Sequence, residues 1–309
     1  MEKFKGLVAA TFTPLNADGS VNLEELPVMI EDAIAADMAG FYILGSTGEG
    51  ISMTTGERKV VAEKIVESVS GRVPVIVQVG HNSIEESKGL ARHAAAIGAT
   101  AISANAPSYF KINNVDMLIE CLAEICSAAP EVPFYYYHIP ALTGAYIDMV
   151  EFLEKAPARI PSLVGIKFSE LNPGKFLQCK LFQGGKYDIL WGCDEQLLAA
   201  MAVGADAAVG STYNFMPRLY QEVMRNYYEK NIPVAMELMK KAYDYVEILN
   251  TFAPIHPCMK ATMRMLGYKV GTHRLPQPAT TEEQERKLRK ALENAGFFEW
   301  SVKPLKVLS

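Results

Sequence analysis

The feature that most constrains this chain is a regular alternation of short apolar runs with longer amphipathic segments. Runs typical of strands buried on both faces occur at 7–12, 41–44, 73–79, 100–105, 132–137, 163–168, 187–191 and 207–209. Segments with helical periodicity lie near 24–38, 55–69, 83–97, 114–129, 148–156, 173–182, 195–203 and 216–229. Repeated strand–helix units predict parallel strands joined by right-handed crossovers.

This pattern predicts an α/β fold, a (β/α)8 TIM barrel with a C-terminal helical extension. A doubly wound open sheet is the alternative, but eight units in about 230 residues favour closure. We expect residues 1–230 to form the barrel and 231–309 to form the extension, with helices at 233–249, 256–266 and 281–295. No Gly/Ser linker precedes the extension, so we expect it to pack on the barrel. The Pro-rich loop 269–279 should lie extended on the surface.

Composition disfavours disordered, polynucleotide-binding and membrane-spanning classes of protein. The 309 residues are 50% hydrophobic and carry a net charge of −5, which disfavours both disorder and a polynucleotide-binding surface. No apolar run is long enough for a membrane span, and the first residues lack the apolar segment of a signal peptide. The five cysteines are scattered and form no C-x-x-C pair, which favours a reducing, cytoplasmic location.

In a barrel of this kind, functional residues lie at the carboxyl ends of the strands. Lys167 is the most informative of them, because Ile166 and Phe168 place it in a buried strand pattern. Burial disfavours the charged ammonium, and a free amine in a barrel lumen suggests Schiff-base chemistry on a carbonyl substrate. The alternative is a lysine that reaches solvent or pairs with a carboxylate.

Tyr137 ends the preceding strand, so its phenol can meet Lys167 if both side chains point inward. Period two puts Tyr135 and Tyr137 on one face and Tyr136 on the other. By the same rule Ser169 shares the face of Lys167. A phenol beside an amine can relay protons, although most strand tyrosines only pack.

The 45–50 loop, Gly-Ser-Thr-Gly-Glu-Gly, offers backbone N–H groups and the hydroxyls of Ser46 and Thr47 to a carboxylate or phosphate. It lacks the P-loop and dinucleotide patterns, and a tight turn is the alternative. Asp194 and Glu195 are adjacent, so they suit polyol hydrogen bonding better than paired acid–base catalysis, and Asp194 is equally suited to cap a helix. The five histidines have no metal-ligand spacing, so we expect no metal.

Three motifs in order resemble a known family: Gly45-Ser46-Thr47-Gly48-Glu49, Tyr137 before Ile139-Pro140, and Gly165-Ile166-Lys167. Over nearly its whole length the chain resembles the pyruvate-dependent class I aldolases, the superfamily of dihydrodipicolinate synthase and N-acetylneuraminate lyase. Segments 135–144, 165–169, 192–198 and 209–214 are most similar to the lyase subgroup. Leu142 stands where the synthases usually carry an arginine, and Ser46-Thr47 where they usually carry two threonines; both differences count against synthase activity.

The resemblance implies a carbon–carbon lyase that cleaves N-acetylneuraminate to N-acetylmannosamine and pyruvate, with no metal or organic cofactor. It implies that Lys167 forms the Schiff base, that Tyr137 transfers the proton and that Ser46 and Thr47 hold the carboxylate. The sugar hydroxyls would meet Ser169, Gly192, Asp194, Glu195 and Ser211. Tyr109 resembles the catalytic-site tyrosine that a neighbouring subunit presents, which implies a homotetramer. A role for Phe252 is not implied.

Three alternatives stay open at this point. One is an aldolase for another 2-keto-3-deoxy sugar acid, since Asp194 and Glu195 favour a polyol without fixing its length. Another is a synthase-like condensation. The third is a non-catalytic sugar-acid sensor on the same barrel, which would have no need to keep both Lys167 and Tyr137.

Overall fold

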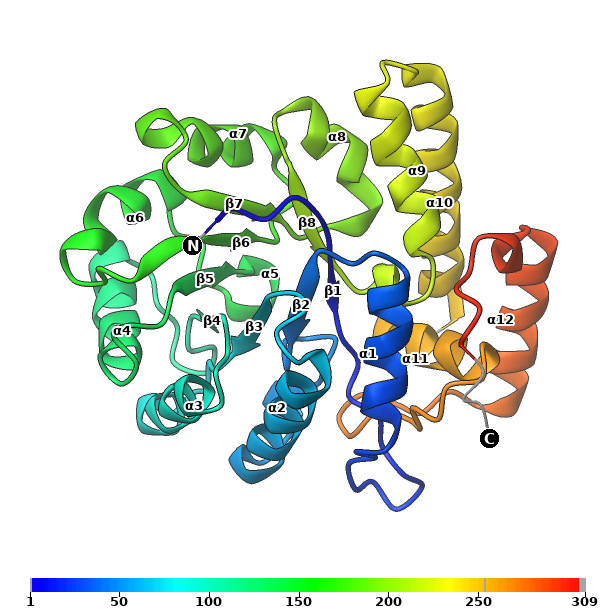
Figure 1. The fold of residues 1–309 in the computed structure, drawn as a ribbon, viewed down its shortest axis with the longest axis horizontal. Coiled ribbons are helices and arrows are strands. Elements are labelled where there is room, and N and C mark those ends of the chain that lie inside the picture. Colours follow the sequence, from blue (N-terminus) through cyan, green and yellow to red (C-terminus); the bar gives the residue numbers. More distant parts are fainter. Residues whose placement is uncertain (1, 253, 306–309) are drawn as a thin grey trace.

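The computed structural model describes residues 2–252 and 254–305, and it is a closed barrel of parallel strands with helices around it (Figure 1). The strands are β1 (Gly6–Ala10), β2 (Gly40–Ile43), β3 (Val75–Gln78), β4 (Ala101–Asn105), β5 (Phe134–His138), β6 (Leu163–Phe168), β7 (Asp188–Trp191) and β8 (Ala207–Gly210). Each strand pairs with its neighbours in chain order, and β8 pairs with β1. The predicted (β/α)8 barrel is confirmed, and the open sheet is wrong.

The helices between and after the strands are α1 (Glu25–Ala35), α2 (Thr55–Val69), α3 (Ile84–Ala96), α4 (Val115–Ser127), α5 (Pro140–Thr143), α6 (Met149–Lys155), α7 (Pro173–Leu181), α8 (Leu197–Ala202) and α9 (Pro217–Tyr228). Single 3₁₀ turns occur at Gly50–Ser52, Ala156–Ala158, Phe182–Gly184, Asp194–Gln196, Thr212–Asn214 and Phe297–Glu299. Only the short α5 was not predicted, because so short a helix has no apolar periodicity. In the described residues no helix is long and apolar enough to cross a membrane.

The start of α2 shows how local sequence fixes the exit of the 45–50 loop. The Thr54 hydroxyl accepts a hydrogen bond from the Glu57 backbone N–H at 3.2 Å, and the Glu57 carboxylate accepts one from the Thr54 N–H at 3.0 Å. This reciprocal capping box satisfies two donors that the first turn leaves unpaired. The chain therefore leaves the loop at a defined angle.

β5 divides its side chains between two hydrophobic clusters. Tyr135 and Tyr137 belong to the cluster that fills the lumen, together with Tyr42 and Leu190. Tyr136 belongs to the larger cluster between the strands and the helices. The faces predicted from period two are confirmed.

The extension consists of α10 (Ile232–Phe252), α11 (Ile255–Met265) and α12 (Glu282–Asn294). α10 packs against α9 and α8, and α11 and α12 pack against α10. In Figure 1 these helices, coloured yellow to red, lie together on one side of the barrel. The division of the chain into units 1–230 and 231–309 stays a prediction.

The loop 269–279 differs from its prediction. Val270 is buried, and its carbonyl accepts a hydrogen bond of 3.0 Å from the Leu15 N–H. His273 is buried as well. The prediction that the whole loop lies on the surface is wrong, because the turn after β1 and the loop after β2 pack over its first half.

Candidate active site

Lys167 lies in β6, buried in the lumen with 4% of its surface exposed. Its Nζ is 3.9 Å from the centre of the Tyr42 ring and 4.2 Å from the centre of the Tyr137 ring. Within the described part of the chain, no carboxylate forms an ion pair with it. The alternatives of a solvent-exposed or carboxylate-paired lysine are therefore wrong. Two aromatic faces hold this amine.

A cavity of about 140 Å³ surrounds this amine at the carboxyl ends of the strands. Its lining contains most of the predicted site residues: Ser46, Thr47, Tyr137, Lys167, Ser169, Gly192, Asp194 and Ser211. Residues 137 and 167 are register partners in adjacent strands, as their predicted meeting requires. The structure thus brings these side chains together, while their chemical roles stay predictions.

Hydroxyl groups gather on one side of the cavity. The Ser46 hydroxyl lies 3.4 Å from the Tyr137 phenol, and the Thr47 hydroxyl lies 2.6 Å from that of Ser211. The Tyr137 ring meets the Tyr42 ring edge to face, and the Tyr42 phenol donates to Ser103 at 3.0 Å. Burial raises the pKa of Tyr42 well above its ordinary value. Hydroxyl donors and acceptors therefore line the cavity that contains the amine.

Asp194 contributes the one carboxylate of the lining. Its Oδ2 accepts hydrogen bonds from the Thr212 N–H at 2.8 Å and the Thr212 hydroxyl at 2.7 Å. Burial raises the pKa of Asp194 to about 6, against the effect of those bonds. A Cβ at Gly210 would lie 2.3 Å from Oδ1, so this position of β8 leaves room for the carboxylate. Asp194 is not the N-cap of the turn or helix that follows it in the chain, and no side-chain capping bond forms there, so that alternative is wrong.

Two predicted residues lie outside the lining. Glu195 follows Asp194, and its side chain does not reach the cavity. Tyr109 is 78% exposed and packs edge to face on Phe110, with ring centres 5.1 Å apart. A single chain therefore leaves Tyr109 away from Lys167, and its contribution to a neighbouring subunit stays a prediction.

Leu142 from α5, which the sequence singled out by its difference from the synthases, lines the cavity. His256 from α11 lines it as well, and no sequence signal pointed to that histidine. Both also line a neighbouring cavity of about 340 Å³, which shares Ser46 and Tyr137. Burial lowers the pKa of His256, and the charge of Lys167 lowers it further. Phe252 ends α10, where its carbonyl accepts a hydrogen bond from Gln284, and it lines neither cavity.

Ser169 and Gly192 close the side of the cavity formed by β6 and β7. The Ser169 hydroxyl donates to the Gly192 carbonyl at 3.2 Å, and a Cβ at Gly192 would lie 2.0 Å from that hydroxyl. Among the described residues, no three His, Cys, Asp or Glu side chains lie together in a group that could hold a metal ion. The polar side chains among the described residues of the lining are therefore an amine, hydroxyls, one carboxylate and the imidazole of His256.

The barrel and this lining define a class: a (β/α)8 protein with a buried lysine amine at the mouth of its lumen. A family model described as the Dihydrodipicolinate synthetase family matches residues 3–295. The N-acetylneuraminate lyase of Gallus gallus is 37% identical over 95% of this chain and 96% of its own length. N-acetylneuraminate lyase A of Xenopus laevis is 40% identical over 79% of this chain and 81% of its own.

Solved structures agree with these sequences. The N-acetylneuraminate lyase of Proteus mirabilis superimposes with a TM-score of 0.92 at 37% identity. The superposition covers 96% of this chain and 100% of the Proteus mirabilis chain. The chain belongs to the dihydrodipicolinate synthetase family.

Proposed function

We propose that this protein is a Schiff-base lyase that reversibly cleaves N-acetylneuraminate to N-acetylmannosamine and pyruvate. The observation that carries the proposal is the Lys167 amine, buried beside two tyrosine rings in a cavity that Ser46 and Tyr137 also line. The similarity to N-acetylneuraminate lyases over nearly the whole chain supports the choice of substrate. A lysine amine that reacts with a ketone needs no further cofactor.

In the first step the Lys167 Nζ attacks the C2 ketone of the open-chain sugar acid. Loss of water from the adduct gives an iminium. The hydroxyls of Ser46 and Thr47, with the backbone N–H groups of their loop, bind the C1 carboxylate, and the cavity lining around Lys167 contains both residues. The Lys167 nitrogen is thus bound to C2, and the iminium there can accept the electrons of the C3–C4 bond in the next step.

In the second step the C3–C4 bond breaks. Tyr137, assisted by the substrate carboxylate, takes the proton from the C4 hydroxyl, and C4 becomes the aldehyde of N-acetylmannosamine. The bond electrons pass to the iminium, which becomes the enamine of pyruvate. Protonation at C3 and hydrolysis by water release pyruvate and restore the amine. The 3.4 Å between the Tyr137 phenol and the Ser46 hydroxyl supports a proton path between them.

The sugar chain would extend toward β7 and β8. Ser169, Gly192, Asp194 and Ser211 line that side, and we assign them to the sugar hydroxyls. We give Glu195 the same role, which requires a turn of its side chain toward the substrate. An aldolase for another 2-keto-3-deoxy sugar acid would use the same residues, and kcat/KM across a panel of such acids separates the two.

Leu142 distinguishes this site from that of a synthase. It lines both cavities, and no arginine is among the described residues that line them. A second substrate with its own carboxylate would therefore meet a leucine where it needs a cation. This argues for a cleavage substrate with one carboxylate.

We further propose a homotetramer in the cytoplasm. Tyr109 and Phe110 are 78% and 83% exposed, and such apolar side chains at a surface suit a subunit contact through which Tyr109 reaches a neighbouring site. Cys121, Cys126 and Cys179 are free thiols, which suits a reducing compartment.

The test is pyruvate release from N-acetylneuraminate by the wild type and by Lys167→Ala. We expect the variant to lose activity by about a thousandfold or more, since the nucleophile is gone. Lys186→Ala is the matched control, because its Nζ also lies over a tyrosine ring, 5.0 Å from Tyr187, but on the surface. Borohydride reduction with pyruvate should label Lys167 alone. Label on Lys186, or no pyruvate from the folded wild type, contradicts the proposal.

A further inference from the structure

Behind the 45–50 loop lies an ion pair that the proposed chemistry does not use. The Glu49 carboxylate at the end of the loop is 4% exposed, and its Oε1 is 2.7 Å from the Nζ of Lys260. Lys260 lies in α11 of the C-terminal extension and is fully buried, 0% exposed. The two residues are 211 positions apart in the chain. A buried pair of this kind connects the active-site loop to the extension.

The Lys260 ammonium has a second partner on the extension. It donates a hydrogen bond of 3.0 Å to the Thr272 carbonyl. Burial lowers the pKa of Lys260, and the Glu49 carboxylate acts against that shift. Lys260 lines neither of the two cavities, whereas its partner Glu49 lines the one of about 340 Å³, so Lys260 acts on a substrate through the residues that it holds.

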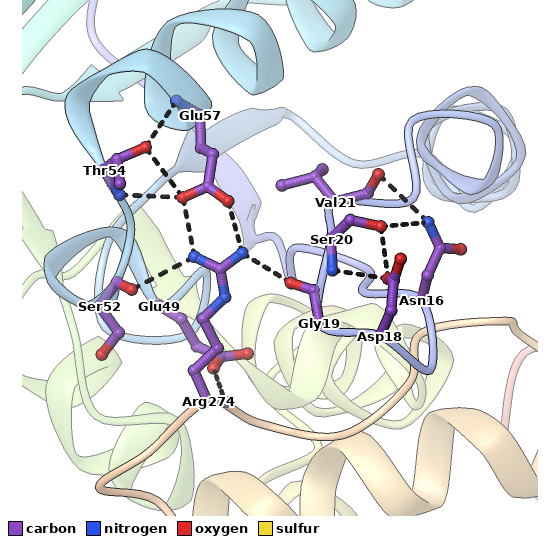
Figure 2. Close-up of polar contacts among 10 residues, drawn as sticks. All are labelled: Asn16, Asp18, Gly19, Ser20, Val21, Glu49, Ser52, Thr54, Glu57 and Arg274. Atoms are coloured by element: carbon purple, nitrogen blue, oxygen red, sulfur yellow. Dashed lines mark hydrogen bonds and ion pairs between the residues drawn. The ribbon is translucent and has the colours of Figure 1, made fainter.

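The other oxygen of Glu49 is held by the loop after α11. Its Oε2 accepts the Arg274 backbone N–H at 2.9 Å. The Arg274 guanidinium binds both oxygens of Glu57 at 2.8 and 2.5 Å, and it also donates to the Gly19 carbonyl at 2.7 Å (Figure 2). Figure 2 shows this arginine between the start of α2 and the turn after β1. Both ends of the Glu49 carboxylate are therefore fixed.

The loop itself has a backbone that needs support. Leu44 and Glu49, which flank Ser46 and Thr47, have φ values of 60° and 55° in the left-handed region that side chains disfavour. A Cβ at Gly50 would lie 2.0 Å from the Leu44 carbonyl oxygen, so the two ends of the loop are in close contact. Conformations of this kind persist only where the surroundings hold them.

We propose that Glu49 and Lys260 are positioning residues that hold the 45–50 loop so that Ser46 and Thr47 bind the substrate carboxylate. The inference rests on the proposed function. Glu49 and Lys260 supply no reacting group; they fix the backbone that presents the two hydroxyls. The extension, which contributes Lys260, is thereby part of the substrate-binding machinery.

Lys260→Met tests this assignment, and the double variant Glu49→Gln/Lys260→Met serves where a lone buried carboxylate prevents folding. We expect the KM for pyruvate in the condensation direction to rise about 10- to 100-fold, because a misplaced binding group has effects of that size. The kcat should change by less than about threefold, since the reacting groups are untouched.

Arg264→Met is the matched control. Arg264 lies one turn further along α11 and binds Glu285 and the Gly271 carbonyl, so its loss perturbs the same helix and the start of the loop after it but removes no contact with the 45–50 loop. Its KM should equal that of the wild type. Equal rises in both variants would show that the ion pair only packs the extension, and would overturn the proposal.

Amide hydrogen exchange gives a readout that does not depend on activity. Peptides covering 44–50 should exchange at least about tenfold faster in the Lys260 variants than in the wild type and the Arg264 variant. Unchanged exchange overturns the positioning role. Faster exchange with an unchanged KM overturns its link to the carboxylate. If the wild type neither releases pyruvate nor forms the borohydride adduct, the proposed function fails, and the exchange result still decides the positioning role.

Discussion

Asp194 carries a charge where burial opposes one. Its carboxylate is 8% exposed and receives two hydrogen bonds from Thr212. With a pKa of about 6, it is mostly ionised at pH 7 and accepts hydrogen bonds, whereas below pH 6 it becomes neutral. A sugar hydroxyl that donates to this carboxylate would therefore be held more weakly in acid.

The variant Asp194→Asn should raise the KM for N-acetylneuraminate about 10- to 100-fold, because a hydrogen bond to a charged acceptor contributes about 1.5–3 kcal/mol. Formation of the pyruvate adduct on Lys167 should be unchanged. In the wild type the KM should rise as pH falls through about 6, the pKa of Asp194, and in the variant this dependence should vanish. Loss of the pyruvate adduct in the variant would instead assign Asp194 to the amine.

At the residue scale the sequence predicts what lies on the strands themselves. Lys167 and Tyr137 were found because strand ends and period two place them together, and the register confirms that placement. Tyr42 gave no signal, since an aromatic residue in an apolar strand is typical of packing. The pairing of Glu49 with Lys260 has no local signal either, because it depends on how α11 docks after the barrel has closed.

β6 and β7 approach each other more closely at Gly165 than any side chain allows. Gly165 is the register partner of Asp188, and a Cβ there would lie 1.9 Å from the Asp188 carbonyl oxygen. Backbone atoms cannot move aside as a flexible side chain can. The strand that carries Lys167 therefore depends on this glycine two residues earlier.

Gly165→Ala should lower the free energy of unfolding by about 1–3 kcal/mol or more, as overpacking does. Gly89→Ala is the control: Gly89 lies inside α3, nothing is within 4 Å of its added Cβ, and alanine should stabilise the helix by about 0.5–1 kcal/mol. Urea denaturation of both variants measures the difference. Equal stabilities would mean that β6 and β7 separate without cost.

At the element scale the strands were predicted well, because buried apolar runs end where polar or glycine residues begin. The helices of the barrel were predicted well because their stripes are amphipathic, as in α4. The loop 269–279 was predicted wrongly. Its proline content suggested a surface position, yet contacts with Leu15 and Glu49, both more than 200 positions away, bury its first half.

At the scale of the whole molecule, histidines that are buried in the neutral state make the fold less stable in acid. Burial lowers the pKa of His138, His256 and His273, the last to about 3. In the unfolded chain these groups bind protons below about 6.5, so the unfolded state takes up more protons than the folded state there. The stability they confer is present above pH 6.5 and is lost as pH falls. Asp194 acts in the opposite sense between about 6 and its unfolded value of 3.8.

We expect the free energy of unfolding to decrease by about 1–3 kcal/mol per pH unit between pH 6.5 and 5.5, since three histidines outweigh Asp194 and Asp188, the two carboxyls whose pKa burial raises. Urea midpoints at pH 7.5, 6.5 and 5.5 measure it. His138→Gln should make the dependence shallower, because His138 is fully buried at 0% exposure and lines neither cavity. A midpoint that stays constant over this range contradicts the expectation.

The whole architecture was predictable because eight similar units leave few ways to bury their strands. The contribution of the C-terminal extension to the active site was not predictable. His256 and Lys260 lie in a helix whose apolar stripe predicts only that it packs. Which loop it packs against depends on tertiary geometry, for which neither periodicity nor composition gives a rule.

The separation of Glu49 and Lys260 sets an order of events during synthesis. Their codons are 211 positions apart, and at about 5–20 residues per second a ribosome needs about 10 to 40 s to pass from one to the other. Throughout that interval the Glu49 carboxylate lacks the amine with which it pairs in the folded chain. All eight strands leave the ribosome before Lys260 does. A growing chain can therefore form the whole barrel before Lys260 and Arg274, the residues that hold Glu49 in the 45–50 loop, have been made.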